Sequence, residues 1–464
     1  MAVGDAPEAA SAVQYRDEIV RIEPKGIEHV TESERHGRPS SVFSLWWGAN
    51  VELATLSTGV AAVALFGVNF KEAAIGILIG NVIGALILAG LSTFGPRLGV
   101  PQLVQSRAAF GFFGNFAPGI LNMIAGVMWF GVNTVLGVFA LTALTGMNFL
   151  VGLIIMAGIQ VLVAVYGYNL IHAFERVMAI VLTLVFIGVS VFAFGHAHYN
   201  LPFDAKAPVA FGGVSGGIIE SMALALSYLF GWTAFASDYT RYLPTKTRPA
   251  SVFGSAGWSS FISCLWLELV GVALATVFPA AAAGTNPVAV LTAIPGHWLV
   301  ALALIAVCIG TVTANVLNIY SGSLSALVVN IPLKRWTAAI VVGVVGAVVA
   351  YIGHTNYYVE YENFLFLLAY WIAPWAAIVL VDYFMYRKGQ FETVLFYNAR
   401  RVLRPGLWAW AIGVVVSIPF FNQSMYAGPV ATHLPQIGDV SYFVSFIVAG
   451  GVYWLWTRGR PVTA

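Results

Sequence analysis

Long apolar stretches dominate the chain from residue 41 onward. A helix that crosses the hydrocarbon core of a bilayer needs about 20 predominantly apolar residues. Twelve stretches reach that length, so the pattern predicts a set of membrane-spanning helices near residues 41–66, 72–94, 115–144, 147–166, 170–194, 213–236, 252–279, 297–324, 336–353, 358–386, 405–421 and 440–457.

Lysine and arginine residues test this assignment, because they concentrate in the cytoplasmic segments of membrane proteins. Of the 22 basic residues, all but Lys71 and Lys206 fall on one side of the predicted spans. An even number of spans with both termini in the cytoplasm explains this distribution. We therefore divide the chain into a cytoplasmic tail over residues 1–40, a core of ten spans over residues 41–386, and two accessory spans with a short cytoplasmic C-terminus over residues 387–464.

The composition excludes several other classes of protein. Only 9% of the residues are charged and 59% are apolar, whereas about a quarter of the residues of a soluble domain are charged. A net charge of +2 provides no basic surface for a nucleic acid. The first 30 residues lack the apolar segment of a signal peptide, so we expect the first span to direct membrane insertion.

Four predicted spans carry polar or helix-breaking residues near their centres, where a lipid-facing helix has none. The first contains SLWWGANVELATLSTG and the sixth contains SYLFGWTAFASDYTRYL. Interrupted helices at corresponding places in the two halves of a transporter indicate an inverted repeat with a binding site near the midplane. Spans one to five and six to ten then form the two halves, and the polar third and eighth spans are counterparts.

Few acidic side chains lie within the predicted spans, and Glu52 is the most informative of them. An ionisable group at the centre of a spanning helix costs about 2.5–3.5 kcal/mol even on a lenient scale. We interpret Glu52 as a protonated or cation-paired carboxyl, with a position at the membrane edge as the alternative. Glu268 lies in a leucine-rich stretch and is interpreted as a partner in an interhelical hydrogen bond, and Glu220 is a third candidate for burial.

Two tryptophans differ from the rest of the 14, most of which lie near span ends as interfacial anchors. Trp129 in the third span and Trp232 in the sixth lie deep in their helices and close to glycines, with Gly231 directly beside Trp232. Two large aromatic faces can hold a flat ring between them by offset stacking. Core packing is the alternative interpretation of this pair.

Amide side chains in the third and eighth spans complete the candidate site. Asn133 follows Trp129 by four residues and so lies on the same helix face, and the eighth span contains Asn315 and Asn318. Helix packing is the alternative role for these amides. Together with the tryptophans they favour a polar, planar ligand.

The remaining polar residues indicate no catalytic or metal site. His196 and His198 lie in the connection after span five without further ligands, and no nucleophile, paired carboxylate or phosphate loop shares a helix face. The sequence therefore predicts that the chain is not an enzyme and binds no cofactor. Two charged pairs are interpreted as structural contacts at the cytoplasmic edge: Asp238 with Arg241, and Asp382 with Arg387.

Six motifs along nearly the whole chain resemble those of the nucleobase cation symporter-1 family, and most of all its purine-cytosine permease branch. They are GIEHVTESER, WWGAN, SRAAFG, WFGVN, GWTAFASDYTRY and NVLNIYS, in that order. The resemblance implies a LeuT-like fold, that is, an all-α membrane protein with a 5+5 inverted repeat and two accessory helices, that works by alternating access. It also implies that Trp129 and Trp232 sandwich a flat heterocycle whose edge is read by Asn133 and Asn315, with Asn318 as a further candidate.

The resemblance also bears on the coupling ion. Sodium sites in the family use carbonyls of the first span, which here correspond to Ala49 and Glu52, and hydroxyls of the eighth span. The adjacent hydroxyl pair of sodium-dependent members is missing here, because Val312 separates Thr311 from Thr313. A buried carboxyl exchanges a proton at neutral pH more readily than an exposed one, so Glu52 favours proton over sodium coupling.

These observations predict a symporter that imports a nucleobase, either cytosine or a purine, across the cytoplasmic membrane with H⁺ or Na⁺. The alternative is a permease of the same fold for another heterocycle, such as allantoin, hydantoin or a thiamine precursor. The expected partners are the small-molecule substrate and the lipid bilayer, without nucleic acid. The sequence does not indicate an oligomeric state.

Overall fold

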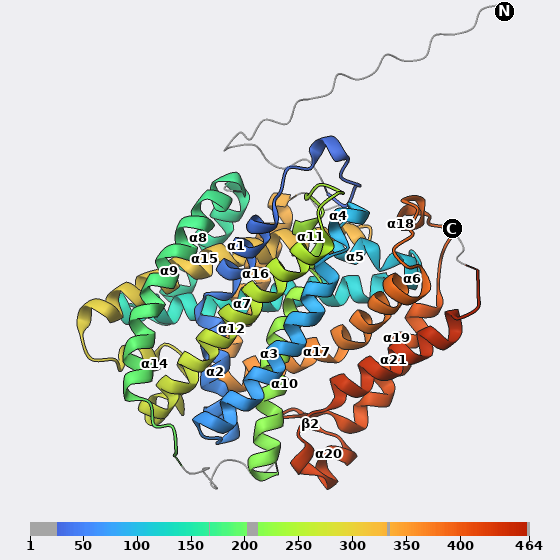
Figure 1. Cartoon of the computed structure of the whole chain (residues 1–464). Helices are drawn as coiled ribbons and strands as arrows, with labels where there is room; N and C mark the ends of the chain where they lie inside the picture. Colours follow the sequence, from blue (N-terminus) through green and yellow to red (C-terminus); the bar gives the residue numbers. More distant parts are fainter. Residues whose placement is uncertain (1–25, 167, 202–211, 332–334, 462–464) are drawn as a thin grey trace, which may run out of the picture.

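Helices make up most of the computed structural model, which describes residues 26–166, 168–201, 212–331 and 335–461 (Figure 1). Each predicted span coincides with a helix or a helix pair. These are α1 (Pro39–Asn50) with α2 (Leu53–Phe66), α3 (Phe70–Ser92), α7 (Phe116–Thr145), α8 (Phe149–Tyr166), α9 (Tyr168–His196), α10 (Gly213–Thr233) with α11 (Ala236–Thr240), α12 (Pro249–Val277), α15 (His297–Val328), α16 (Arg335–Gly353), α17 (Tyr357–Val381) with the π-helical turn Asp382–Tyr386, α19 (Pro405–Ser417) and α21 (Ser441–Thr457).

Short elements connect these helices. They are α4 (Gly95–Leu98), α5 (Gln102–Gln105), α6 (Arg107–Phe110), α13 (Pro279–Ala282), α14 (Ala289–Thr292), α18 (Val394–Tyr397) and α20 (Pro429–His433), with 3-10 turns at Glu32–Glu34, His354–Asn356, Ile418–Phe420 and Pro435–Ile437. A hairpin of two short strands, β1 (Asn422–Gln423) and β2 (Tyr426–Ala427), pairs antiparallel between α19 and α20. The hairpin is a small addition to the all-helical fold that the sequence predicted.

The lengths of the helices agree with the predicted spans. Seven described helices are long and apolar enough to cross a membrane, or eight when the bent pair α1 and α2 is taken as one span. One of the seven, Trp336–Tyr386, includes both α16 and α17, and three further apolar helices are shorter: Phe149–Val165, Pro405–Phe420 and Ser441–Thr457. The described chain is thus consistent with twelve spans.

Both interruptions expected from the sequence are present. The first span bends by 52° between α1 and α2, and Val51 and Glu52 form the break. The sixth span is interrupted by a turn at Ala234 and Phe235, which separates α10 from α11. Backbone groups at such breaks lose their helical partners, which is tolerated at membrane depth only where the segment is buried in protein or lines a cavity.

The packing of the helices has the symmetry of a five-plus-five repeat. The bundle helices, α1, α2, α3, α10 and α12, pack mainly among themselves, as do the scaffold helices, α7, α8, α15 and α16. In such a repeat, each of spans one to five corresponds to the span five places later in the chain. When corresponding spans are exchanged, each of four packed helix pairs becomes another packed pair. The α3–α10 pair becomes α12–α2, α1–α9 becomes α10–α17, α7–α16 becomes α15–α8, and α9–α15 becomes α17–α7. This correspondence supports the two halves inferred from the interrupted helices.

Local sequence marks several helix ends. At the start of α3, the backbone N–H of Glu72 donates to Asn69 Oδ1 at 3.0 Å, and that of Asn69 donates to Glu72 Oε2 at 2.9 Å, which forms a capping box. Gly67 ends α2 with a φ of 66°, a left-handed conformation that glycine adopts without strain. Proline at the first helical position begins α1, α12 and α19.

Small residues allow the two bundle helices α2 and α12 to touch along their backbones. A Cβ atom on Gly59 would lie 1.8 Å from the carbonyl oxygen of Glu268, and one on Gly271 would lie 2.0 Å from the carbonyl oxygen of Leu56. Helices associate in membranes largely through such close approach of small residues. The Glu268 side chain accepts a hydrogen bond from the amide of Asn81 on α3, which confirms the interhelical role predicted for it.

Residues 26–37, called the N-terminal strap below, lie across one end of the molecule, and the C-terminal end of the chain lies toward the same end (Figure 1). The guanidinium of Arg35 donates to the carbonyls of Pro96 and Leu243, which follow spans two and six. Two chain ends on one side agree with an even number of spans. Residues 1–25 of the predicted tail lie outside the described residues, as do Lys206 and Lys334.

The strap also contacts two further segments at this end. The hydroxyl of Tyr397 on α18 donates to the carbonyl of Ile27 at 2.6 Å, and Arg241 donates to the carbonyl of Gly26 at 2.8 Å. The strap thus joins the connections that follow spans two, six and ten. Of the two charged pairs predicted nearby, Arg387 and Asp382 form an ion pair at 3.2 Å.

A neighbouring connection is held by a buried arginine. Arg107 on α6 is 1% exposed and donates to the carbonyls of Phe396 and Val328 at 2.9 and 2.8 Å. Burial lowers its pKa to about 10, so the guanidinium remains charged at neutral pH. Asp238 on α11 accepts a hydrogen bond from the backbone N–H of Gln102 at 2.9 Å, which ties the same connection to the sixth span.

We predict that Gly271→Leu destabilises the protein strongly, because the side chain has to displace the α2 backbone. Overpacking of this kind costs about 1–3 kcal/mol or more. Thermal unfolding of the purified protein in detergent measures the loss. The matched control is Gly158→Leu on α8, where a Cβ atom meets nothing within 4 Å; an equal loss of stability in both variants would contradict the assigned backbone contact.

Candidate functional site

The break in the first span places a carboxyl group in the interior of the molecule. Glu52 adopts an extended conformation between α1 and α2 and is 4% exposed. Its Oε1 accepts a hydrogen bond from the hydroxyl of Tyr228 on α10 at 3.0 Å, and its Oε2 has no partner among the described residues. Thr55 contacts the same hydroxyl at 2.7 Å. The edge position considered from sequence is therefore wrong, and Glu52 is buried.

The two tryptophans predicted to hold a flat ring lie face to face. The ring planes of Trp129 on α7 and Trp232 on α10 differ by 13°, and their centroids are 6.4 Å apart. A flat ligand in contact with both rings needs a separation of roughly 7 Å, or two carbon–carbon contact distances. The two rings are nearly parallel, as a flat ligand stacked on both of them requires.

Gly231 allows this arrangement. A Cβ atom on Gly231 would lie 3.0 Å from Cζ2 and 3.1 Å from Nε1 of Trp129. These distances are tighter than ordinary van der Waals contact, so a side chain at this position would press on the Trp129 ring. The residue beside Trp232 on one helix therefore fixes how closely the other tryptophan approaches.

Three aromatic residues that the sequence did not single out surround Trp129. Tyr228, Tyr361 and Phe364 meet its ring nearly edge-on, with centroid distances of 5.7, 6.4 and 5.2 Å and interplanar angles of 87°, 74° and 79°. Edge-to-face contacts of this kind are favourable and hold a ring in one orientation. Trp46, which is fully buried on α1, contacts Trp232 in the same manner at 5.7 Å.

The three predicted amides have different surroundings. Asn133 is 1% exposed, and its Oδ1 has no hydrogen-bond partner among the described residues. By contrast, the Nδ2 of Asn315 donates to the carbonyl of Phe130, the hydroxyl of Thr134 and the Oε1 of Gln160 at 3.1, 3.2 and 3.0 Å. Its Oδ1 accepts from Asn318 at 3.2 Å. Asn315 and Asn318 thus belong to a network that joins α7, α8 and α15.

Several buried polar atoms around the tryptophans have no protein partner among the described residues. They include the indole Nε1 atoms of Trp46 and Trp232, Oδ1 of Asn133 and Oε2 of Glu52. Buried polar groups are usually hydrogen-bonded, and each exception needs an explanation. Two donors and two acceptors near parallel aromatic rings are the groups that a flat, polar heterocycle can satisfy.

The residues proposed to bind a cation are less closely associated. Ala49 and Glu52 flank the break in the first span, as expected. The hydroxyls of Thr311 and Thr313 donate to carbonyls of their own helix, those of Cys308 and Gly310, at 3.0 and 2.7 Å. No described contact joins these threonines to the break in the first span.

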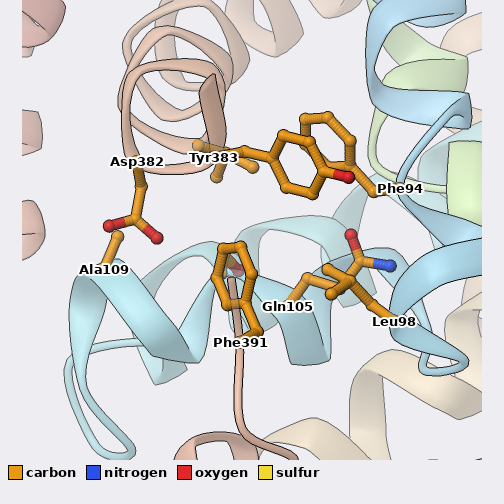
Figure 2. Close-up of a pocket in the computed structure, with 9 residues that line it drawn as sticks. Phe94, Leu98, Gln105, Ala109, Asp382, Tyr383 and Phe391 are labelled. Carbon is orange, nitrogen blue, oxygen red and sulfur yellow. The ribbon is translucent and has the colours of Figure 1, made fainter. Parts of the chain in front are cut away.

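A separate small cavity lies between the end of α17 and the connections α4 to α6 (Figure 2). Its wall combines stacked aromatic rings, with Phe94 and Tyr383 at a centroid distance of 3.7 Å, and the amide of Gln105. It contains none of the predicted site residues. Its lining residues are Phe94, Leu98, Gln105, Ser106, Ala109, Val379, Asp382, Tyr383 and Phe391.

Comparisons with known proteins identify relatives over nearly the whole chain. The chain is 28% identical over 454 residues to the putative purine-cytosine permease YxlA of Bacillus subtilis (strain 168), covering 95% of this chain and 97% of the relative. It is 28% identical over 460 residues to the purine-cytosine permease fcyB of Emericella nidulans, covering 94% and 88%.

A solved structure has the same fold. It is Mhp1, a nucleobase-cation-symport-1 family transporter in a closed conformation with bromovinylhydantoin bound. The TM-score is 0.73 at 19% identity, and the match covers 96% of this chain and 97% of Mhp1. The LeuT-like architecture expected from the sequence is thereby confirmed.

The family match extends over most of the chain. It begins at residue 29, three residues into the GIEHVTESER motif, and ends at residue 445 within α21. All five of the other motifs noted in the sequence fall inside this range. The chain belongs to the family of permeases for cytosine/purines, uracil, thiamine and allantoin.

Proposed function

We propose that this permease is a secondary active symporter that imports a nucleobase, cytosine or a purine, across the cytoplasmic membrane together with protons. Both termini face the cytoplasm in this proposal, in accord with the distribution of basic residues. The parallel rings of Trp129 and Trp232 carry the argument for the substrate. A nucleobase is flat, offers aromatic faces for stacking, and has a polar edge.

The edge of the base is read in this proposal by groups that the protein leaves unpaired. Asn133 lies one helical turn after Trp129 and has a free carbonyl oxygen, and the indole N–H of Trp232 has no partner among the described residues. Both lie on helices whose rings form the slot. Asn315 and Asn318 then act by positioning α7 and α15 rather than by touching the base.

Protons are the proposed coupling ions because of the surroundings of Glu52. Its carboxyl group is buried with a single hydrogen-bond donor, and the described ion pairs do not include it. An isolated buried carboxylate is costly and is neutralised by binding a proton. Its donor Tyr228 also contacts Trp129, so one tyrosine connects the proton site to the stacking site.

Replacement of the stacking residue tests the substrate assignment. Trp129→Ala is expected to weaken binding of cytosine or adenine, because stacking on an aromatic side chain contributes about 1–3 kcal/mol per base, or roughly 5- to 150-fold in affinity. Competition against radiolabelled nucleobase in proteoliposomes measures the change. The control is Trp298→Ala, since that ring is 84% exposed; if no nucleobase competes, or if Trp129→Ala transports normally, the assignment is wrong.

Variants of Asn133 and Asn315 are expected to affect different properties, nucleobase binding in the first case and protein stability in the second. Asn133→Ala should raise the Kd for the nucleobase while the unfolding temperature changes little, because its carbonyl bonds no described residue. Asn315→Ala should lower the unfolding temperature, because it removes the buried hydrogen bonds from Asn315 to α7 and α8 and leaves the amide of Asn318 without its described acceptor, a loss of about 1–3 kcal/mol. Binding and thermal unfolding are measured on the same preparations. Weaker binding only in Asn315→Ala, with a lower unfolding temperature only in Asn133→Ala, would assign substrate contact to Asn315 and helix positioning to Asn133.

Glu52→Gln tests the coupling ion. The variant is expected to lose accumulation driven by a pH gradient and to retain exchange of labelled for unlabelled nucleobase, because glutamine keeps the hydrogen bond but binds no proton. Glu268→Gln is the control, since Glu268 is equally buried but bonds Asn81. Undiminished gradient-driven accumulation in Glu52→Gln, or accumulation that follows sodium at constant pH, would remove Glu52 from the proton pathway.

A further inference from the structure

Three buried carboxyl groups lie together at the end of the molecule opposite the N-terminal strap. They are Glu220 near the start of α10, Glu362 near the start of α17 and Asp439 just before α21, and they are 0%, 2% and 0% exposed. We call them the carboxyl cluster. The hairpin that begins at Asn422 brings them together: Asn422 donates to both Glu220 and Asp439, at 2.6 and 2.8 Å, and Ser424 donates to Asn363, the neighbour of Glu362, at 2.8 Å.

Asp439 has more described hydrogen bonds than the other two carboxyl groups of the cluster. It accepts hydrogen bonds from the hydroxyl of Tyr370 at 2.5 Å, the backbone N–H of Asn422 at 2.8 Å, and the backbone N–H and hydroxyl of Ser441 at 2.9 and 2.5 Å. Burial nevertheless raises its pKa above the ordinary aspartate value. These donors come from three elements, so the carboxyl ties α17, the β1 strand and α21 together.

The two glutamates have fewer partners. Oε1 of Glu220 accepts from the amide of Asn422 at 2.6 Å, and Oε2 has no partner among the described residues. Oε1 of Glu362 is also buried without a described partner. Burial of an ionised carboxylate without a counter-charge is so unfavourable that such groups bind a proton instead. The ion pairs that the structure describes include none of the three carboxyls.

A tyrosine outside the acidic set also points to a small ligand here. The hydroxyl of Tyr442 on α21 is buried and lacks a hydrogen-bond partner among the described residues, and it lies close enough to Asp439 and Glu220 to interact electrostatically. The other titratable groups that face the cluster are Tyr370 and, from the exposed side of α17, Glu360. The described residues at the cluster do not form a metal-binding group, so a proton is the ligand that this chemistry fits.

The first turns of α17 connect the cluster to the stacking site. Tyr361 and Phe364 contact Trp129, whereas Glu362, between them in sequence, belongs to the cluster. The same helix contains Pro374, which removes a backbone hydrogen bond and allows the first half of a helix to bend relative to the second. A displacement of Glu362 therefore also displaces Tyr361 and Phe364, whose rings contact Trp129.

We propose that Glu220, Glu362 and Asp439 form a proton-binding site, separate from Glu52, that holds the first half of α17 against α10 when it is protonated. Release of the proton adds like charge between the two helices, and the repulsion moves the first half of α17 away from Trp129. The proton site does not depend on the identity of the substrate. Its effect on transport rests on the proposed function, in which this end of the molecule faces the outside.

Hydrogen exchange of the intact, substrate-free protein in lipid nanodiscs tests the proposal. The peptide over residues 357–366 is followed from about pH 5 to about pH 9 and corrected for the intrinsic exchange rate with an unfolded reference peptide. If opening releases one proton, the opening equilibrium rises by up to about tenfold per pH unit. Constant corrected exchange over this range in the wild-type protein would overturn the proposal without any variant, whatever the outcome of transport assays.

Variants identify the groups responsible. Glu362→Gln, alone and with Glu220→Gln, should reduce or abolish the pH dependence, because glutamine cannot ionise. Glu360→Gln is the matched control, since this carboxyl is two residues away on the same helix but exposed, and it should retain the wild-type response. An unchanged response in the double variant, or exchange that follows sodium at constant pH, would contradict a proton site at these residues.

Discussion

The hydrogen bond between Glu52 and Tyr228 joins the two interrupted spans at the centre of the molecule. Glu52 forms part of the break between α1 and α2, and Tyr228 lies on α10, one turn before Trp232. Because the broken backbone and the carboxyl both need polar surroundings, the break persists only where another helix supplies a donor. Tyr228 supplies it and also packs against Trp129, so the position of the stacking rings depends on the same contact.

The two stacking tryptophans belong to different groups of helices. Trp129 lies on the scaffold helix α7 and Trp232 on the bundle helix α10, and these groups pack mainly within themselves. The spacing between the rings therefore depends on how the groups are placed relative to each other. A relative shift of the two groups therefore changes the distance between the rings. A rearrangement of the two groups of helices would thus act directly on the proposed stacking site.

Much of this architecture could be predicted from the sequence because its signals are strong and local. The apolar lengths predicted the spans, and Gly48, Asn50 and Glu52 within one span predicted its break. Tyr361 and Phe364 could not be recognised, because an aromatic residue in an apolar helix has the same appearance whether it faces lipid or a ligand. The role of Asn315 was also hidden, since only its partners on α7 and α8 distinguish a packing amide from a binding one. The strap, with its few apolar residues, gave no indication of where it docks.

The N-terminal strap also constrains the order in which the molecule can be completed during synthesis. Its residues leave the ribosome before any of the predicted spans, but the tyrosine that bonds Ile27 lies 370 positions later in the chain. Until α18 has been made, this segment has only part of its final set of partners. The contact between Ile27 and Tyr397 can therefore form only after the ten intervening spans have been synthesised. The contact therefore joins the N-terminal strap to a segment that follows all ten helices of the repeat.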